Sequence, residues 1–229
     1  MSLFFDSSQL PTPTFEYVAW IDVMGTQSTM SRSISASANF IAKLHIAALQ
    51  APRTNIAIYP IMDGIYASCP NQNEILEFIR SVFTQVAEEF SLATKDQHRF
   101  MVRGGLAFGP TYHGRNFGQS ASSVLTQNPA HRDALLLGMP VIQAYTSESS
   151  APPFGLFVHE SARAFSPQGQ GPIPHSLWRW VNSTNQTTWT TLKAQLPIYL
   201  KWCSDNSFIL GYPAEGLKKH TEMATQYFA

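Results

Sequence analysis

The pattern of apolar and polar positions is clearest at residues 16–23, where apolar side chains fill nearly every position of an extended segment. Val18, Trp20 and Asp22 fall on one face of that segment, because successive side chains of a strand point to opposite sides. A strand with so few polar positions is typical of the centre of a sheet. We therefore predict a central strand that ends at Asp22, a place where an unpartnered carboxylate is costly.

Helical spacing follows over residues 26–51 and again over residues 71–94, with apolar residues at three- and four-residue intervals. In the first helix, the predicted buried stripe consists of Ile34, Phe40, Ile41, Leu44, Ala47 and Leu49. In the second, it consists of Ile75, Phe78, Ile79, Val82, Phe83, Val86 and Phe90. Between the helices, residues 55–69 hold two apolar runs joined near Asp63-Gly64, which favours a hairpin with a two-residue turn.

The chain returns to strand character over residues 99–114, and residues 131–149 are predicted to form a helix with a kink at residues 138–140. Residues 154–165 have the pattern of a strand that leads into a short helix. The order strand, helix, two strands, helix, strand predicts an α+β fold. We expect a ferredoxin-like βαββαβ palm, in which helices pack on one face of an antiparallel sheet.

We predict a single domain with additions at both ends. Residues 1–14 contain two prolines and form an N-terminal arm, and residues 15–165 form the core. Residues 166–229 contain many Gly, Pro and Trp residues, so we expect a loop-rich C-terminal elaboration packed on the same domain. It ends in a helix at residues 214–228.

Charge and composition narrow the classes of function. The 15 Lys and Arg residues balance 15 Asp and Glu residues, so no basic field attracts a nucleic acid polymer, whereas a mononucleotide needs only local charge. Cys69 and Cys203 belong to no CxxC pair and are predicted to be reduced thiols. The sequence shows no signal peptide and no run of the roughly 18 apolar residues that a membrane helix needs. We therefore expect a cytoplasmic protein without a membrane segment.

Asp22 and Asp63 carry the strongest chemical signal. In the predicted topology the first and third strands are neighbours, so the hairpin tip with Asp63 stands beside Asp22. Two carboxylates at one edge of a sheet repel each other, which favours a divalent cation between them. The loop after Asp22 includes Gly25 and Thr26 and leads into a helix whose first N–H groups can bind phosphate oxygens. Each aspartate alone has a commoner interpretation, as a helix N-cap or a turn residue.

Three segments in this order resemble the class III nucleotidyl cyclases: "VAWIDVMGT", "YPIMDGIYAS" and "MVRGGLAFG". The resemblance covers roughly residues 15–145 and implies a cyclase palm with two Mn²⁺ or Mg²⁺ ions in each site. It implies that Asp22 and Asp63 are metal ligands and that the Val23 carbonyl helps to hold the second ion. It also implies that Arg103 approaches the phosphates and takes part in catalysis. In this family the active sites are shared between the two chains of a homodimer.

Tyr59 departs from the family's pattern. Purine-specific members carry a lysine four residues before the hairpin's acidic residue, and here that position is Tyr59. Strand alternation places Tyr59 on the same face as Asp63, where a phenol would shrink the base pocket and favour a one-ring base. A tyrosine packed in the sheet core is the alternative. The departure resembles the pyrimidine cyclases of bacterial antiphage (Pycsar) signalling, which make cyclic UMP or cyclic CMP as second messengers. We expect a pyrimidine nucleoside triphosphate as substrate, with UTP favoured over CTP.

A second departure lies in the helix after the later strand. The Asn and Arg positions of familiar adenylyl cyclases hold Ile142 and Thr146 here. Arg115 and Arg132 are candidates for the missing cation. Arg132 and Asp133 either contact the base or form an exposed ion pair with each other. The same departure leaves open a catalytically silent cyclase-like domain that binds a nucleotide or a partner. A two-aspartate nuclease is the least favoured hypothesis, because it requires a basic groove for a polymer.

Overall fold

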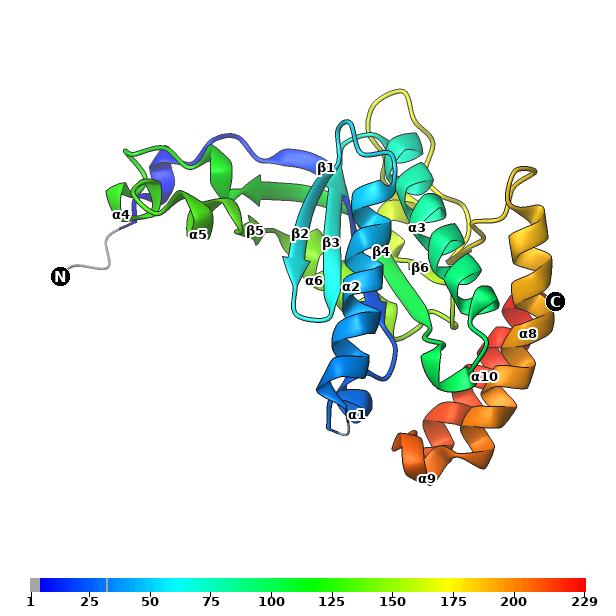
Figure 1. The fold of residues 1–229 in the computed structure, drawn as a ribbon. Helices are drawn as coiled ribbons and strands as arrows, with labels where there is room; N and C mark the ends of the chain where they lie inside the picture. Colours follow the sequence, from blue (N-terminus) through cyan, green and yellow to red (C-terminus); the bar gives the residue numbers. More distant parts are fainter. Residues whose placement is uncertain (1–4, 32) are drawn as a thin grey trace.

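The computed structural model describes residues 5–31 and 33–229, so Arg32 and the first four residues of the predicted arm lie outside the described chain. Its helices surround one sheet (Figure 1). The strands are β1 (Thr14–Val23), β2 (Ala57–Ile61), β3 (Gly64–Cys69), β4 (Val102–His113), β5 (Leu136–Leu137), β6 (Leu156–Val158) and β7 (Leu177–Trp178). The α-helices are α1 (Thr26–Met30), α2 (Ile34–Gln50), α3 (Gln72–Leu92), α4 (Ser123–Thr126), α5 (Pro129–Asp133), α6 (Met139–Glu148), α7 (Glu160–Ala164), α8 (Gln186–Asp205), α9 (Ser207–Leu210) and α10 (Ala214–Phe228). Short 3₁₀ helices occupy Ser7–Gln9, Asp96–His98 and Gly114–Asn116.

The sheet confirms the predicted α+β class. Its strand order is β2-β3-β1-β4-β6-β7, and β5 pairs with β4 outside this path. β1 is central, between β3 and β4 and antiparallel to both, as the ferredoxin-like order requires. β6 then pairs with β4 in parallel. The sheet is therefore mixed, whereas the prediction was a purely antiparallel sheet.

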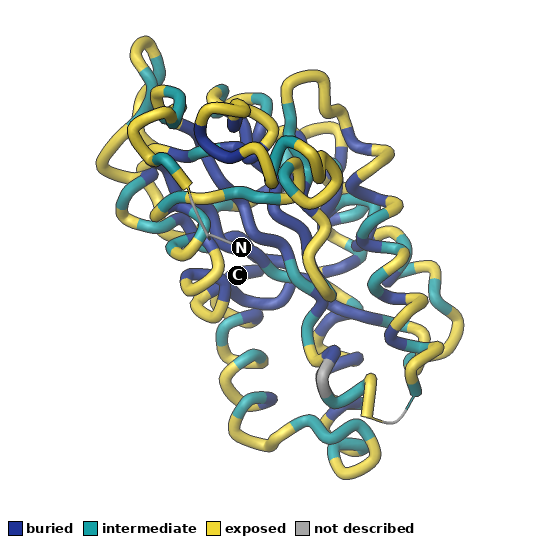
Figure 2. Tube along the Cα trace, turned by 90° about the vertical axis from the view of Figure 1, so that its left-hand side faces the viewer, coloured by how far each residue is buried: buried dark blue, intermediate teal, exposed yellow. Residues whose placement is uncertain are grey.

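Helices cover both faces of the sheet. α2 and α3 lie over one face, and the larger apolar core is between these helices and the strands (Figure 1). α6 lies against β1 and β4 on the other face, over a smaller cluster that includes Val18 and Trp20. The central strands β1, β3 and β4 are mostly buried, whereas the loops at both ends of the molecule are exposed (Figure 2). The expectation of helices on one face only is therefore wrong.

The two predicted long helices differ in how well they match their patterns. α3 buries all of its predicted stripe. The prediction for residues 26–51 is wrong in part, because Ser33 caps a new helix by accepting a hydrogen bond from the N–H of Ala36 at 3.2 Å. The region is therefore divided into α1 and α2. Ile34 is 79 % exposed because it lies at the first turn of α2, and Leu49 is exposed near its last turn.

The β2–β3 turn consists of Met62 and Asp63, one residue earlier than the predicted Asp-Gly turn. Met62 adopts the left-handed backbone conformation with φ 52°. Gly64 is instead the first residue of β3, where a Cβ atom would lie 2.5 Å from the Trp20 ring. The glycine is thus required by packing against β1, and Asp63 takes the tip of the hairpin.

Two regions after β4 differ from prediction. Residues 131–149 do not form one kinked helix, because Gly138 (φ 150°) separates β5 from α6. A Cβ atom at Gly138 would lie 2.5 Å from the Pro110 carbonyl oxygen. The C-terminal region is not loop-rich, since α8 runs for 20 residues, through Pro197, and packs against α3 and α10.

Cys69 and Cys203 are buried free thiols, as predicted. Across residues 5–31 and 33–229, each helix is too short or too polar to cross a membrane.

Candidate active site

Asp22 and Asp63 come together where β1 meets the tip of the β2–β3 hairpin. The strand register pairs Asp22 with Gly64, the residue after Asp63, and on the other side with Arg103 of β4. Directly opposed residues of antiparallel strands have Cβ atoms about 5 Å apart. The backbone therefore brings two carboxylates and one guanidinium group to the same end of the sheet, with Val23 as the last residue of β1.

The surroundings of Asp22 oppose its ionisation. Burial raises the pKa of Asp22 to about 7, and the charges of Asp63 and Glu148 act in the same direction, whereas Arg103 and the N–H of Val23 oppose them. The Oδ1 atom of Asp22 is buried and has no hydrogen-bond partner among the described residues. Because an unsatisfied buried polar atom costs about 1–3 kcal/mol, a positively charged ligand would be bound favourably here.

Gly25 and Thr26 connect this end of β1 to α1. The Thr26 hydroxyl donates a hydrogen bond to Oδ2 of Asp63, which fixes the hairpin tip against the start of α1. Gly25 has φ 78°, a conformation that glycine adopts without strain. A Cβ atom at Gly25 would meet nothing within 4 Å, so its backbone lies in open space. Thr26 thus positions Asp63, while Gly25 leaves the adjacent backbone accessible to a ligand.

Arg103 is held by side chains from two helices. Its Nε donates to the Glu148 carboxylate at the end of α6. Its Nη1 donates to Nε2 of His220 in α10 at 3.2 Å. Gly105 allows the first contact, because a Cβ atom there would lie 2.1 Å from the Ala144 carbonyl oxygen and would push α6 away from β4.

A cavity of about 390 Å³ lies beside these residues. The sheet end contributes Asp22, Val23, Met24, Gly25, Thr26, Ser28, Thr29 and Arg103 to its lining. The C-terminal region contributes Tyr199, Cys203, Leu210, Tyr212, Pro213, Gly216 and His220. Asp63 is not part of the lining but is joined to it through Thr26. The volume is in the range of small-molecule sites.

Tyr59 belongs to a polar cluster on the same sheet face, which we call the Glu16 cluster (Thr14, Glu16, Tyr59, Ser68 and His113). The Tyr59 hydroxyl is hydrogen-bonded to Nδ1 of His113, and Nε2 of His113 donates to both Glu16 oxygens at 3.0 Å. The hydroxyls of Ser68 and Thr14 also donate to Glu16. Tyr59 is 4 % exposed, so within one chain its hydroxyl serves this cluster. Its contact with a base stays a prediction.

Arg115, Arg132 and Asp133 belong to the Tyr59 end of the molecule. Burial raises the pKa of Tyr59, and the charge of Arg115 opposes that effect whereas Asp133 adds to it. Arg132 forms an ion pair with its neighbour Asp133 at 2.8 Å. None of the three lines the cavity beside Asp22, so within one chain their side chains are not part of its wall.

Ile142 and Thr146 do not contribute to the cavity either. Both are exposed on α6, and the Thr146 hydroxyl donates to the carbonyl oxygen of Ile142 at 3.0 Å. The side chain that α6 does bring to the site is Glu148, two residues further along.

Two residues of the site were missed in the sequence, Glu148 and His220. Glu148 lies in the polar run "TSES", which is typical of an exposed helix end, yet it is only 8 % exposed. His220 lies three residues after Leu217 and four before Ala224, so it falls on the apolar side of α10. That helical spacing was a usable signal for His220, whereas nothing in the local sequence indicated Glu148.

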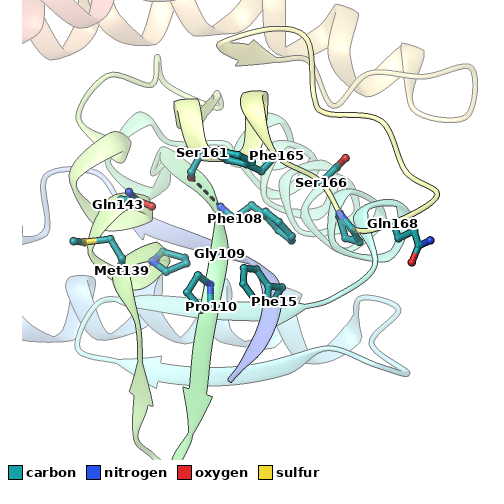
Figure 3. Close-up of a pocket in the computed structure, with 12 residues that line it drawn as sticks. Phe15, Phe108, Gly109, Pro110, Met139, Gln143, Ser161, Phe165, Ser166 and Gln168 are labelled. Carbon is teal, nitrogen blue, oxygen red and sulfur yellow. Dashed lines mark hydrogen bonds between the residues drawn. The ribbon is translucent and has the colours of Figure 1, made fainter. Parts of the chain in front are cut away.

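A larger cavity of about 560 Å³ lies elsewhere, between β1, β4, α6 and the segment after α7 (Figure 3). Its lining is mostly apolar, with Phe15, Phe108 and Met139 among the residues around it. The hydroxyl of Ser161 accepts a hydrogen bond from the N–H of Phe108 at 3.1 Å. Among the residues that the structure describes, no Asp, Glu, His, Lys or Arg side chain lines this cavity, so its described lining offers no group for acid–base or phosphate chemistry.

No protein-family profile matches the chain, and no curated protein matches it in sequence. Among solved structures, the monomeric guanylyl cyclase domain of the RhoGC fusion protein from the aquatic fungus Blastocladiella emersonii, in a double-mutant form, aligns with 67% of this chain and 83% of its own, at 16% identity and a TM-score of 0.51. The chain has the fold of a class III cyclase catalytic domain.

Two further solved structures are similar to this chain. The guanylate cyclase domain of RhGC from Catenaria anguillulae in complex with GTP aligns with 66% of this chain and 81% of its own, at 15% identity and a TM-score of 0.46. A bacterial light-regulated adenylyl cyclase aligns with 61% of this chain and 71% of its own, at 14% identity and a TM-score of 0.46. The fold assignment rests on the Blastocladiella domain alone.

The donors at the Asp22 end of this cyclase fold suit a divalent cation such as Mg²⁺ or Mn²⁺. Asp22 offers a buried oxygen without a hydrogen-bond donor, and Asp63 lies beside it. In the described parts of the chain, no three His, Cys, Asp or Glu side chains are grouped as a complete metal site. Because Mg²⁺ is usually held by one or two carboxylates together with substrate phosphates, a cation here would need a phosphate-bearing ligand to complete its coordination.

Proposed function

We propose that this chain is a nucleotidyl cyclase that converts a pyrimidine nucleoside triphosphate, with UTP favoured over CTP, into its 3′,5′-cyclic monophosphate and pyrophosphate. The convergence of Asp22, Asp63 and Arg103 at one end of a cyclase-fold sheet carries this proposal. Carboxylates that hold divalent cations next to a cationic side chain are the working parts of phosphoryl-transfer sites.

Each residue has a role in this proposal. Asp22, Asp63 and the Val23 carbonyl hold two Mg²⁺ or Mn²⁺ ions, which when bound supply positive charge for the triphosphate and favour ionisation of the ribose 3′-hydroxyl. Gly25 and Thr26 lie along the triphosphate. Arg103 stabilises the charge that develops on the phosphates. The 3′-oxygen forms a bond to the α-phosphorus, its proton passes to solvent, and the bond to pyrophosphate breaks.

The pyrimidine preference is proposed from Tyr59, which replaces a purine-reading lysine. With it we propose a second-messenger role in antiphage defence and a homodimer with shared sites, in which Tyr59 of one chain reads the base held at its partner's metal site. Large apolar side chains support a partner surface, since such patches mark interaction sites. On or beside the sheet face that carries Tyr59, the exposed large apolar side chains include Ile61, Met62, Ile142 and Tyr145.

The test is a competition between the four nucleoside triphosphates. The purified protein is incubated with an equimolar mixture and Mn²⁺, and products are separated by chromatography while pyrophosphate is measured. We expect cyclic UMP to dominate and product formation to stop on addition of EDTA. A cyclic purine nucleotide as main product would refute the base preference, and release of pyrophosphate from none of the four would refute the cyclase proposal.

A catalytically silent nucleotide-binding or partner-binding domain is the second candidate. Ile142 and Thr146 favour it, because neither side chain can supply the amide or cation found at these positions in familiar adenylyl cyclases. The orphaned oxygen of Asp22 argues against it, since a silent domain has no need for an unsatisfied carboxylate. UTP binding by calorimetry, without any pyrophosphate release, would identify the silent domain.

A further inference from the structure

The C-terminal region forms part of the candidate active site. The segment between α9 and α10, residues 211–213, lies against α1, because the Ser28 hydroxyl donates to the Gly211 carbonyl oxygen at 2.9 Å. Tyr212 and His220 then line the same cavity as Asp22 and Arg103. Residues nearly 200 positions after Asp22 therefore complete the wall of its cavity.

The hydrogen bonds fix the chemical state of His220. A guanidinium group only donates, so Nε2 of His220 accepts the hydrogen bond from Arg103. In a neutral ring the proton is then on Nδ1, which donates to the Tyr212 hydroxyl at 2.5 Å. Burial lowers the pKa of His220 to about 4, and the charges of Arg103 and Lys219 lower it as well. His220 is thus a neutral acceptor at neutral pH.

Arg103 is held from two sides by groups of different character. Glu148 accepts a hydrogen bond from Nε and supplies the opposite charge. His220 accepts from Nη1 without adding charge. An arginine has five N–H hydrogens, so these two bonds leave up to three for a ligand in the cavity that Arg103 lines.

We propose that His220 is a positioning residue, which together with Glu148 fixes the plane of the Arg103 guanidinium so that its remaining N–H groups face the triphosphate. This inference rests on the proposed function. It gives the C-terminal helix α10 a part in the reaction through Arg103, and it accounts for a half-buried histidine on the apolar side of α10.

The test compares His220→Ala with His220→Gln, which keeps a neutral acceptor near the position of Nε2. We expect His220→Ala to lower kcat about ten- to a hundredfold, the range for losing a hydrogen bond to a charged group, with a smaller change in KM. His220→Gln should recover most of the rate. Gln226→Ala, an exposed change on the same helix, is the matched control and should leave the rate unchanged.

A double-mutant comparison separates positioning from a purely structural role. In an Arg103→Met background, which removes the donor, His220→Ala should change the remaining rate less than about threefold, because contacting residues act as a unit. Equal losses in both backgrounds would overturn the proposal. So would a rate increase in His220→Ala, which would mean that His220 restrains Arg103 instead of positioning it.

Two outcomes need separate readouts. If His220→Ala fails to fold by thermal melting, Tyr212→Phe replaces it, since losing the acceptor for Nδ1 should loosen His220 and lower kcat several-fold. If the wild-type protein releases pyrophosphate from no triphosphate, the cyclase proposal fails and UTP binding with Mn²⁺ is measured by calorimetry. His220→Ala should then weaken binding only when Arg103 is present, and an equal loss in both backgrounds would overturn the positioning role.

Discussion

Glu16 and Asp22 are carboxylates on the same face of β1, six residues apart, and their surroundings are opposite. Burial opposes ionisation of Glu16, but hydrogen bonds from His113, Ser68 and Thr14 outweigh it and lower the pKa of Glu16. Asp22 has a raised pKa and one oxygen without a donor. One carboxylate is satisfied by the protein itself, and the other is not.

The difference separates a structural polar cluster from the candidate ligand site. Buried polar groups are normally hydrogen-bonded, and a native exception calls for an explanation. At the Glu16 end, the neighbours on β3 and β4 are Ser68 and His113, which donate to the carboxylate. At the Asp22 end, the neighbouring carboxylates Asp63 and Glu148 repel it. Folding tolerates this arrangement at a cost that a bound cation would remove.

The largest effect should follow from removing the charge of Asp22. Asp22→Asn preserves shape but cannot neutralise a cation, so we expect pyrophosphate release to fall by at least about 10³-fold. The fold should remain intact by circular dichroism. Asp205→Asn, an exposed change at the end of α8, is the control for general charge effects. Full activity in Asp22→Asn would remove this carboxylate from the site.

The next effect concerns the pH dependence of stability without divalent cations. The folded protein binds the Asp22 proton more tightly than the unfolded chain, so the free energy of unfolding should fall as pH rises from about 4 to about 7, and then level off. The difference between a pKa of about 7 and the ordinary value near 4 corresponds to at most about 4 kcal/mol.

Urea unfolding in EDTA between pH 4 and pH 8 measures this dependence. Since other groups also titrate, the informative quantity is the difference between wild type and Asp22→Asn. We expect the variant to be the more stable protein above pH 7 and the advantage to vanish near pH 4. Parallel curves for the two proteins would contradict the unfavourable environment assigned to Asp22.

Glu16→Gln should destabilise the folded protein at pH 7, whereas Asp22→Asn is expected to stabilise it. The change puts an amide among the donors of His113, Ser68 and Thr14 and removes the charge that they stabilise. We expect the free energy of unfolding at pH 7 to fall by about 2 kcal/mol, while kcat of the folded protein stays near the wild-type value. A variant that keeps its stability but loses kcat would place Glu16 in the active site instead.

Sequence patterns predicted the parts of the fold that depend on periodicity. The spacing in α3 identified its buried residues, and the apolar run before Asp22 identified the central strand. The order of these elements then brought Asp22 and Asp63 to the same end of the sheet, as expected.

The rest depends on contacts that local patterns do not encode. The break at Gly138 follows from the close approach of Pro110, which is distant in sequence. Glu148 and His220 reach Arg103 only because α6 and α10, which are far apart in the sequence, both pack near one end of β4. The spacing of α10 placed His220 on the apolar side of the helix, but only the three-dimensional structure reveals its partner.

The smallest effect should come from Tyr59→Phe, which tests whether the two ends of the sheet face act on one nucleotide. The change keeps the ring in the core and removes only the hydroxyl that bonds to His113. A stability loss of about 1 kcal/mol is expected from this bond alone. If the hydroxyl also reads the base in a shared dimer site, the ratio of kcat/KM for UTP to that for ATP should fall several-fold as well. Lower stability with an unchanged ratio would assign Tyr59 wholly to the Glu16 cluster, and the source of base selectivity would then have to lie elsewhere on the dimer.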